Sequence, residues 1–505
     1  MSAGRAAALL LPLAGALSAC MVGPDYHRPD SPLPAAYAEL AAGRTVAARA
    51  VAGRPDLDRW WRLFHDAELD SLVDRALAGN LDLQQAESRV RQARAELRGT
   101  AAPLWPSLNA TGGVDYLRSS EALGQAFAGP GAAAQPPGAP ATAGATAATP
   151  LPSTLNLYEA GFDATWELDL WGGTRRAVEA ARANVEAAMD SRRDTLVSLL
   201  AEVARTYVVL RGTQNRIVIA ERNIAMQRQQ LELTRARWRA GFTNELDVRQ
   251  LEAQVATSSA IIPALTAEAH RAMHALAVLL GAPPETLAGE LERGGAVPPV
   301  PPAVPVGVPG ELLRRRPDIR RAERQLAAAT ATVGTAIAAL YPQISLTGNA
   351  GYEGTHTDNL FLWSNRFYAL FPSLTLPLFD AGRIGADIDA SRERARQAAL
   401  AYRATVLGAL REVEDSLAAY RTDQQRHAAL VQAAAASRRS VDLARAQYAE
   451  GVITVLAVLD AQRSLLVAED AVVRSDQAVT TDLMALYKAL GGGWETTERP
   501  PAAGH

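Results

Sequence analysis

The chain has 505 residues, of which 48% are hydrophobic and 21% are charged, and its formal net charge is −3. These values describe a large folded protein without the basic excess of a nucleic-acid-binding protein, so nucleic acid is excluded as an expected partner. The chain has a single cysteine, which excludes an internal disulfide.

The N-terminus has the features of a secretory signal. Arg5 precedes an apolar stretch at 6–17, and two small residues lead directly to Cys20. The stretch is too short to cross a bilayer as a helix, and the four residues ending at Cys20 resemble a bacterial lipobox. We therefore expect residues 1–19 to be removed and residues 20–69 to begin with a lipid on Cys20, the only non-protein group expected. The alternative is an ordinary signal peptide with a chance cysteine.

The rest of the chain repeats itself. Two similar halves, 70–281 and 310–490, are joined by a Pro-rich linker at 282–309 and followed by a tail at 491–505. Because proline interrupts both kinds of element, we expect neither a helix nor a central strand in the linker. The matching strings are Asn80-Leu81-Asp82 and Arg316-Pro317-Asp318, Leu168–Gly173 and Leu376–Ala381, and Arg237–Gly241 and Gln447–Gly451.

Alternation of apolar and polar residues predicts a pair of strands in each half. From 158 to 170 every even position is apolar and every odd position is polar or glycine. The predicted strands lie at about 108–116, 158–170, 344–353 and 368–378, and roughly 9–11 residues suffice for a tilted strand to cross a bilayer. The aromatic residues expected to form girdles at both strand ends are Trp105, Trp171, Tyr341 and Phe379.

Four strands are too few to close a barrel. An open edge in lipid leaves backbone groups unpaired at a cost of several kcal/mol each, so several chains must pool their strands. Totals of eight, twelve or sixteen strands remain open. A soluble sheet with one face on a core is the alternative. The stretch at 117–155, rich in Gly, Ala, Pro and Thr, is the expected loop of the first hairpin, and the shorter segment 354–366 is the expected loop of the second.

Helical periodicity fills the rest of each half. Apolar residues recur at every seventh position at 196–238 and, less strictly, at 406–448, which predicts long helices that wind around neighbours. With no proline between 174 and 241, a helix of about 67 residues would be roughly 100 Å long. Shorter helices expected at 70–101 and 244–280 would together cover its length.

Five strings in the chain are specific enough to indicate a family. They are Cys20–Pro29, Trp166–Leu170, Arg314–Asp318, Leu459–Ser464 and Tyr487–Trp494. In this order they resemble the outer membrane efflux proteins of the TolC superfamily, in the lipidated OprM/NodT branch. The resemblance implies an α+β membrane protein: a homotrimer whose 12-stranded β-barrel, four strands from each chain, continues into a 12-helix periplasmic α-barrel.

The function that the resemblance implies is that of an exit duct, not an enzyme. The duct would be anchored in the bacterial outer membrane through its lipid and would serve a tripartite efflux system. Its partners would be a periplasmic adaptor and an inner-membrane transporter of the RND type. The transported substrate stays open, because drugs, metal ions, siderophores and polypeptides all use this scaffold.

The resemblance also implies a gate at the periplasmic entrance. Leu456, Asp460 and Arg463 match the gate region, where three copies of Leu456 would form an apolar constriction and three of Asp460 an acidic ring that favours cations. Asp247 and Tyr448 match a pair that ties helices together in closed family members. Without the resemblance, the alternative for Asp460 is a solvated charge on a coiled coil.

Two hairpin turns match the tips that meet the adaptor. The glycine in each turn also fits a plain helix C-cap. The tip residues are Gly241, Phe242, Thr243, Gly451, Val452, Ile453 and Thr454.

Two other classes of protein remain as alternatives. A passive porin needs no helical extension of roughly 100 Å. A zinc-dependent enzyme could use His270 and His274, which have the i,i+4 spacing of helical zinc ligands. Position 271 is Arg rather than the Glu of the zincin motif, so no metal site is expected.

Overall fold

The computed structural model describes residues 21–30, 32–42, 49–51, 57–118, 154–301 and 303–497. The chain forms two compact units. Unit 1 comprises the described residues before His27 together with Glu96–Ala181 and Ala329–Glu393, and unit 2 comprises the other described residues. Among the described helices, none combines the length and the apolar character needed to cross a membrane.

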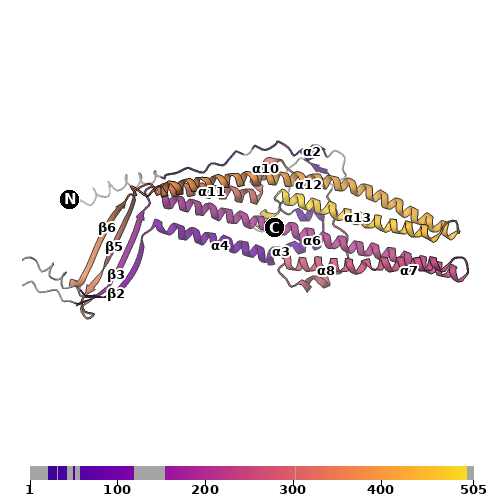
Figure 1. Cartoon of the computed structure of the whole chain (residues 1–505), viewed down its shortest axis with the longest axis horizontal. Coiled ribbons are helices and arrows are strands. Elements are labelled where there is room, and N and C mark those ends of the chain that lie inside the picture. Colours follow the sequence, from indigo (N-terminus) through magenta and orange to yellow (C-terminus); the bar gives the residue numbers. More distant parts are fainter. Residues whose placement is uncertain are drawn as a thin grey trace, which may run out of the picture. The chain divides into compact units, whose positions relative to one another are not determined.

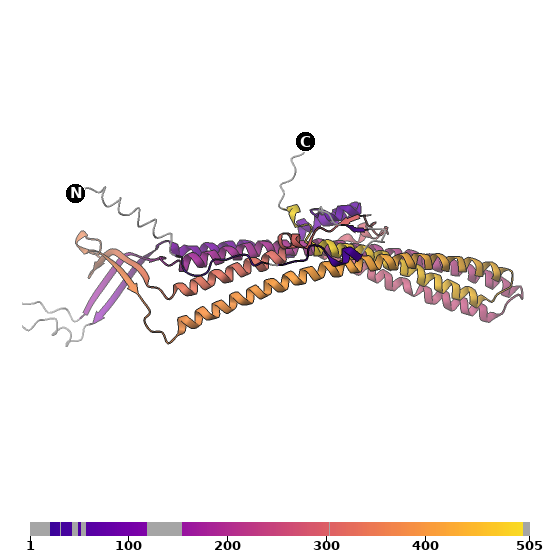
Figure 2. The same cartoon turned by 90° about the horizontal axis from the view of Figure 1, so that it is seen from above.

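Unit 1 contains a four-stranded antiparallel sheet in the order β2-β3-β5-β6 (Figures 1 and 2). Each pair of consecutive strands in one half forms a hairpin, and β3 pairs with β5 to join the two hairpins. β3 begins and ends earlier than the expected range 158–170. The strands are β2 (Ser107–Arg118), β3 (Thr154–Leu168), β5 (Gln343–Gly354) and β6 (Arg366–Thr375).

The strand register gives the two faces of the sheet different characters. Residues that pair across the strands belong to the same face, because side chains alternate along each strand. One row of partners is apolar and consists of Ala110, Phe162, Ala350 and Tyr368. The neighbouring row begins with the polar residues Asn109, Asp163 and Asn349. The alternation in the sequence therefore produces one largely apolar face.

The prediction that the four flanking aromatic residues mark both ends of the strands is wrong. Antiparallel pairing brings the beginnings of β2 and β5 beside the ends of β3 and β6, so all four lie at one end. There Trp171 stacks on Tyr341, with their ring centroids 4.8 Å apart. At the opposite end, the β5–β6 loop exposes Phe361 and Trp363, which were not predicted to form a girdle.

An aspartate lies shortly before each of the two long helices, α6 (Gly173–Arg239) and α12 (Arg383–Ala449), and caps its N-terminus. The Asp169 carboxylate accepts hydrogen bonds from the backbone N–H groups of Thr174 and Arg175, and the Asp380 carboxylate accepts them from Gly382 and Ile384. These bonds satisfy N–H groups that have no partner inside a helix. In both halves, an aspartate carboxylate therefore stabilises the transition from strand to helix.

The remaining helices belong to unit 2, apart from the ends of α4 and α11 that lie in unit 1. They are α2 (Ala38–Ala42), α3 (Ala67–Gly79), α4 (Leu81–Ala101), α7 (Glu245–Ser259), α8 (Ile261–Leu279), α9 (Ala288–Leu291), α10 (Pro309–Arg315), α11 (Pro317–Ala338) and α13 (Val455–Ala489). Short 3₁₀ helices occur at Trp60–Phe64 (η1), Ala102–Leu104 (η2), Pro284–Leu287 (η4), Trp363–Asn365 (η5) and Trp494–Thr497 (η6).

Two helices that were predicted to be continuous are broken. The expected helix 70–101 is interrupted at Asn80, whose side chain accepts a hydrogen bond from the Leu83 N–H at 2.8 Å and caps α4. The expected return helix 244–280 is interrupted at Ala260. Pro263 lies in the first turn of α8 and has no N–H to continue the hydrogen-bond ladder of α7.

The prediction that the linker 282–309 holds no helix is also wrong, whereas its one strand is not a central one. It contains η4 and α9, and its strand β4 (Ala303–Pro305) pairs in parallel with β1 (Arg49–Val51). Among the described residues, β1 and β4 pair only with each other, so both are edge strands. An edge strand tolerates a proline such as Pro305. The N-terminal segment and the linker thus form one structure in unit 2.

The core of unit 2 joins the N-terminal segment to the end of α13. Trp60 stacks on Tyr487 with ring centroids 5.3 Å apart, and Phe64 meets Tyr487 edge-on at 6.4 Å. All three side chains are at most 1% exposed. The residues after α13 also belong to this core, because Trp494 is 9% exposed and lies beneath the guanidinium group of Arg193.

Candidate functional site

The ends of two helical hairpins in unit 2, α6–α7 and α12–α13, contain most of the predicted site residues. Gly241 and Gly451 end α6 and α12 with φ angles of +79° and +76°. Phe242 and Val452 each donate a backbone hydrogen bond of 2.9 Å to the carbonyl five residues earlier. This is the Schellman arrangement, which favours glycine because its φ is positive. Phe242 is 76% exposed and Val452 68%.

A small apolar cluster fastens the two hairpins together behind these turns. Its buried members are Leu231, Val248, Leu251, Tyr448, Val455, Val458 and Leu459, with Val255, Ala444 and Ile453 packed at its edge. Ile453 is therefore partly covered, unlike the other apolar tip residues. Since the cluster draws on α6, α7, α12 and α13, movement of one hairpin against the other exposes apolar surface.

Tyr448 is fixed by α6. Its hydroxyl lies 3.3 Å from the Thr234 hydroxyl, and the guanidinium group of Arg237 lies 4.8 Å from the centre of its ring. Arg237 also donates hydrogen bonds to the carbonyls of Tyr448 and Ala449 at 3.0 and 3.2 Å. A cation near the last carbonyls of α12 interacts favourably with the dipole of the helix. None of these contacts was predicted.

Asp247 has its own partners in the first hairpin. Its carboxylate accepts a hydrogen bond from the Thr243 hydroxyl, and its N–H donates to the Asn244 side chain at 3.0 Å. Within this single chain, Asp247 and Tyr448 are not hydrogen-bonded to each other. The tie between them in a closed assembly stays a prediction.

The predicted gate residues share α13. Leu456 is 51% exposed and the Asp460 carboxylate 65%, and their spacing of four residues puts both on one helix face. Arg463 lies 3.7 Å from Asp460 and donates through Nε to the Gln254 amide oxygen at 2.6 Å. Gln254 is 7% exposed, so Arg463 links α13 to the buried side of α7. No sequence pattern distinguishes this buried glutamine from a surface one.

Cys20 lies outside the described residues, but the residues after it are placed. Val22 donates a backbone hydrogen bond to the Trp171 carbonyl at 3.1 Å. The guanidinium group of Arg176, which is 2% exposed, donates to the carbonyls of Val22 and Gly23 and pairs with Asp25 at 2.8 Å. The chain that follows Cys20 is therefore fixed to the first turn of α6, where β3 ends.

The two histidines considered as zinc ligands, His270 and His274, lie on α8 with ring centroids 6.2 Å apart. The described part of the chain has no group of three His, Cys, Asp or Glu side chains placed to hold a metal ion.

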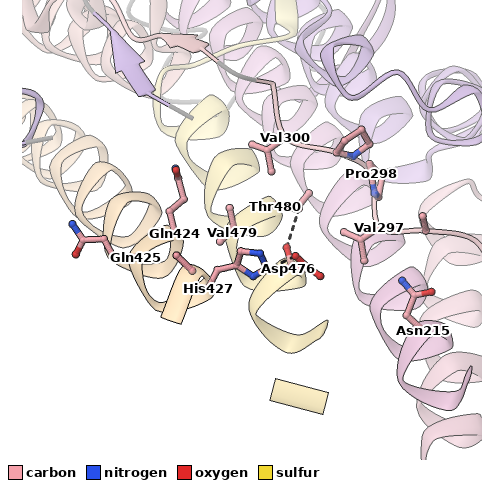
Figure 3. A pocket seen from close by; sticks show the side chains of 13 residues that line it. Asn215, Val297, Pro298, Val300, Gln424, Gln425, His427, Asp476, Val479 and Thr480 are labelled. Atoms are coloured by element: carbon pink, nitrogen blue, oxygen red, sulfur yellow. Dashed lines mark hydrogen bonds and ion pairs between the residues drawn. The ribbon is translucent and has the colours of Figure 1, made fainter. Parts of the chain in front are cut away.

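A cavity of about 720 Å³ lies between α12, α13 and the segment 296–300 (Figure 3). His427 and Asp476 face each other in it across 3.4 Å. Burial raises the pKa of Asp476, and the nearby His427 opposes that rise. Farther along α13, burial and the neighbouring Asp423 raise the pKa of Asp482 to about 7. This part of the α12–α13 contact is therefore sensitive to pH.

Comparison with known proteins identifies the family to which the chain belongs. The family model "Outer membrane efflux protein" matches residues 72–282 and 308–492. The pyoverdine export outer membrane protein OpmQ of Pseudomonas aeruginosa is 34% identical over 95% of this chain and 96% of its own. Nodulation protein T of Rhizobium leguminosarum bv. viciae is 32% identical over 98% of this chain and 94% of its own.

The solved structures agree with the sequence comparison. The outer-membrane channel OprN superposes with a TM-score of 0.82 at 36% sequence identity, covering 94% of this chain and 100% of that one. The resemblance inferred from the five sequence strings is thus confirmed.

Proposed function

The chain belongs to the outer membrane efflux protein family and is an exit channel of the bacterial outer membrane, and we propose that three copies form the duct of a tripartite efflux system. The open sheet of unit 1 carries this proposal. Within the described residues, β2 and β6 each have one neighbour, so in lipid both outer edges need strands from other chains. Three chains would give a closed 12-stranded barrel above a 12-helix periplasmic barrel.

The gate would form where three copies of α13 converge. Leu456 and Asp460 are exposed in a single chain, which leaves them available to face their counterparts. Three carboxylates in one ring raise the local concentration of cations and favour their passage. Asp247 and Tyr448 would act as the tie between helices of the closed entrance.

The hairpin tips would bind the periplasmic adaptor. Phe242 and Val452 expose apolar side chains beside the capped turns, and an apolar side chain held on a rigid turn is a suitable anchor for a partner protein. The adaptor would connect the duct to an inner-membrane transporter of the RND type.

A lipid on Cys20 would hold the chain at the inner surface of the outer membrane. The supporting observation is the attachment of the next residues to Arg176 at the start of α6. A single acyl chain binds membranes only weakly, so a multiply acylated cysteine is the form that would anchor stably.

The decisive experiment measures assembly and ion selectivity together. Purified full-length protein should have the mass of a trimer and form cation-selective pores in planar bilayers. The Asp460→Ala substitution should lower the cation preference, whereas Asp415→Ala, which removes a similarly exposed carboxylate from α12, should leave it unchanged. A dimer or a monomer would contradict the trimer, and equal selectivity of both variants would contradict the acidic ring.

A further inference from the structure

A second cavity in unit 2, of about 450 Å³, is lined mainly by charged side chains. Five arginines and three carboxylates meet there, which leaves two positive charges in excess. The arginines come from the N-terminal segment, α6, α10 and α11. They are Arg28, Arg193, Arg314, Arg320 and Arg324, and we call the cavity that they line the arginine pocket.

The carboxylates of the pocket are already engaged by arginines. Asp190, 4% exposed at its side chain, pairs with Arg193 and also with Arg320 at 3.3 Å. Glu323, 8% exposed, pairs with Arg28 at 3.0 Å and with Arg324. The third carboxylate, Glu186, is 54% exposed and pairs with Arg324 at 3.1 Å. All three acids are therefore engaged by arginines, two of them buried beneath their partners, and the uncompensated charge at the cavity belongs to guanidinium groups.

The pocket is accessible and partly prearranged. The side chains of Arg28, Arg320 and Arg324 are 47%, 31% and 30% exposed. Arg320 is held over the ring of Trp494, 5.4 Å from its centre, and Arg314 is exposed with no ion pair to any described residue. Guanidinium groups that are held in place lose little freedom when they bind an anion.

We propose that the arginine pocket binds a phosphate monoester. A phosphoryl group carries about −1.5 to −2 charges near neutral pH and three acceptor oxygens, which matches the excess charge and the several donors. A carboxylate has one charge and two oxygens in a plane, and would leave part of this excess unbalanced. The volume leaves room for a small organic group beside the phosphate.

Arg314 allows a direct test because it is exposed and its loss breaks no ion pair of the fold. Full-length protein in neutral detergent at low ionic strength is titrated with inorganic phosphate by isothermal calorimetry. We expect saturable binding of one phosphate per chain, weakened about tenfold by Arg314→Ala, the size of one charge-assisted hydrogen bond. Arg314→Glu should weaken it further, and Arg314→Lys should retain part of the affinity.

The control is Arg271→Ala, which removes another exposed arginine, on α8. It should bind phosphate like the unmodified protein. The proposal is overturned if the unmodified protein shows no saturable phosphate binding, or if Arg271→Ala weakens binding as much as Arg314→Ala does.

The source of the phosphate needs a second arm, because a lipid headgroup offers the same chemistry. The titration is repeated in vesicles of phosphatidylcholine alone and in vesicles that also contain phosphatidic acid. A free phosphate ligand predicts equal binding in both, whereas a lipid ligand predicts that phosphatidic acid blocks the binding of inorganic phosphate. If the ligand is a lipid, the affinity of Arg314→Ala for phosphatidic acid should be about tenfold weaker than that of the unmodified protein, as expected for the loss of one charge-assisted hydrogen bond.

Discussion

Removal of Arg463 should loosen the contact between α13 and α7 more than removal of its acidic partner. The guanidinium group makes two interactions, an ion pair of 3.7 Å with Asp460 and a hydrogen bond of 2.6 Å to Gln254. Both side chains of the ion pair are more than half exposed, and exposed ion pairs contribute about 0–1 kcal/mol. The hydrogen bond reaches a buried amide, and charge-assisted bonds contribute about 1.5–3 kcal/mol.

The substitution Arg463→Ala should therefore cost about 2 kcal/mol of α13–α7 contact, because it leaves the Gln254 amide oxygen without its donor. Asp460→Asn should cost well under about 1 kcal/mol, since it removes only the exposed pair. If the closed entrance depends on this contact, 2 kcal/mol corresponds to about a thirtyfold increase in the ratio of open to closed channels.

Single-channel recording in planar bilayers measures that ratio, and hydrogen exchange of α13 measures the loosening independently. The matched control is Arg439→Ala, which removes an exposed arginine from α12. Equal effects of Arg463→Ala and Asp460→Asn would refute the assignment of the stronger contact to Gln254. An Arg463→Ala channel that behaves like Arg439→Ala would refute any role of this contact in closure.

Three further predictions concern stability. The pKa of Asp482 is raised from 3.8 to about 7 in the folded chain, so its stabilising contribution is complete below 3.8 and is lost as the pH rises through 7. Because this carboxyl is only half-buried and solvent screens much of the effect, the free energy of unfolding should fall by about 1–2 kcal/mol over that range, well below the full value of the shift. Thermal unfolding of Asp482→Asn at a series of pH values should not show this fall. The Tyr487 hydroxyl is buried without a hydrogen-bond partner among the described residues. Tyr487→Phe should thus be neutral or stabilising by up to about 1 kcal/mol in denaturant titrations, whereas Tyr487→Ala should cost about 3–5 kcal/mol. Gly451→Ala should loosen the second tip by about 1–2 kcal/mol because φ is +76° there, measured as faster proteolysis of the turn. Gly408→Ala, within α12 and in open space, should instead stabilise its helix.

Features with a local cause could be predicted from the sequence. The strands follow from alternation, because the side chains of a strand point to opposite faces in turn. The turns at Gly241 and Gly451 follow from the conformational freedom of glycine at a helix end. The breaks at Asn80 and Pro263 also had local signals, a capping residue and a residue without an N–H. The continuous helices predicted at 70–101 and 244–280 passed over these signals, because helical hydrophobic spacing continues across a break when both helices pack on the same neighbour.

The contacts that define the site had no local signal. Arg463 and Gln254 are separated by 209 residues, and Arg176 and Asp25 by 151. An arginine has the same appearance in the sequence whether it pairs on its own helix, as Arg411 does, or reaches another element. Such pairings depend on which helices become neighbours, and that information lies in the fold as a whole.

The two units depend on different surroundings for their stability. Unit 2 buries an aromatic core of its own around Trp60 and Tyr487. In the sheet of unit 1, the only buried residue among those described is Gly354, and large apolar side chains such as Phe162 and Leu370 are more than half exposed. In the proposed trimer, lipid would cover the apolar face and strands of neighbouring chains would pair with the edges of β2 and β6. Unit 2 has a core of its own, whereas in the proposed trimer the sheet of unit 1 would complete its structure in the membrane with strands of the other chains.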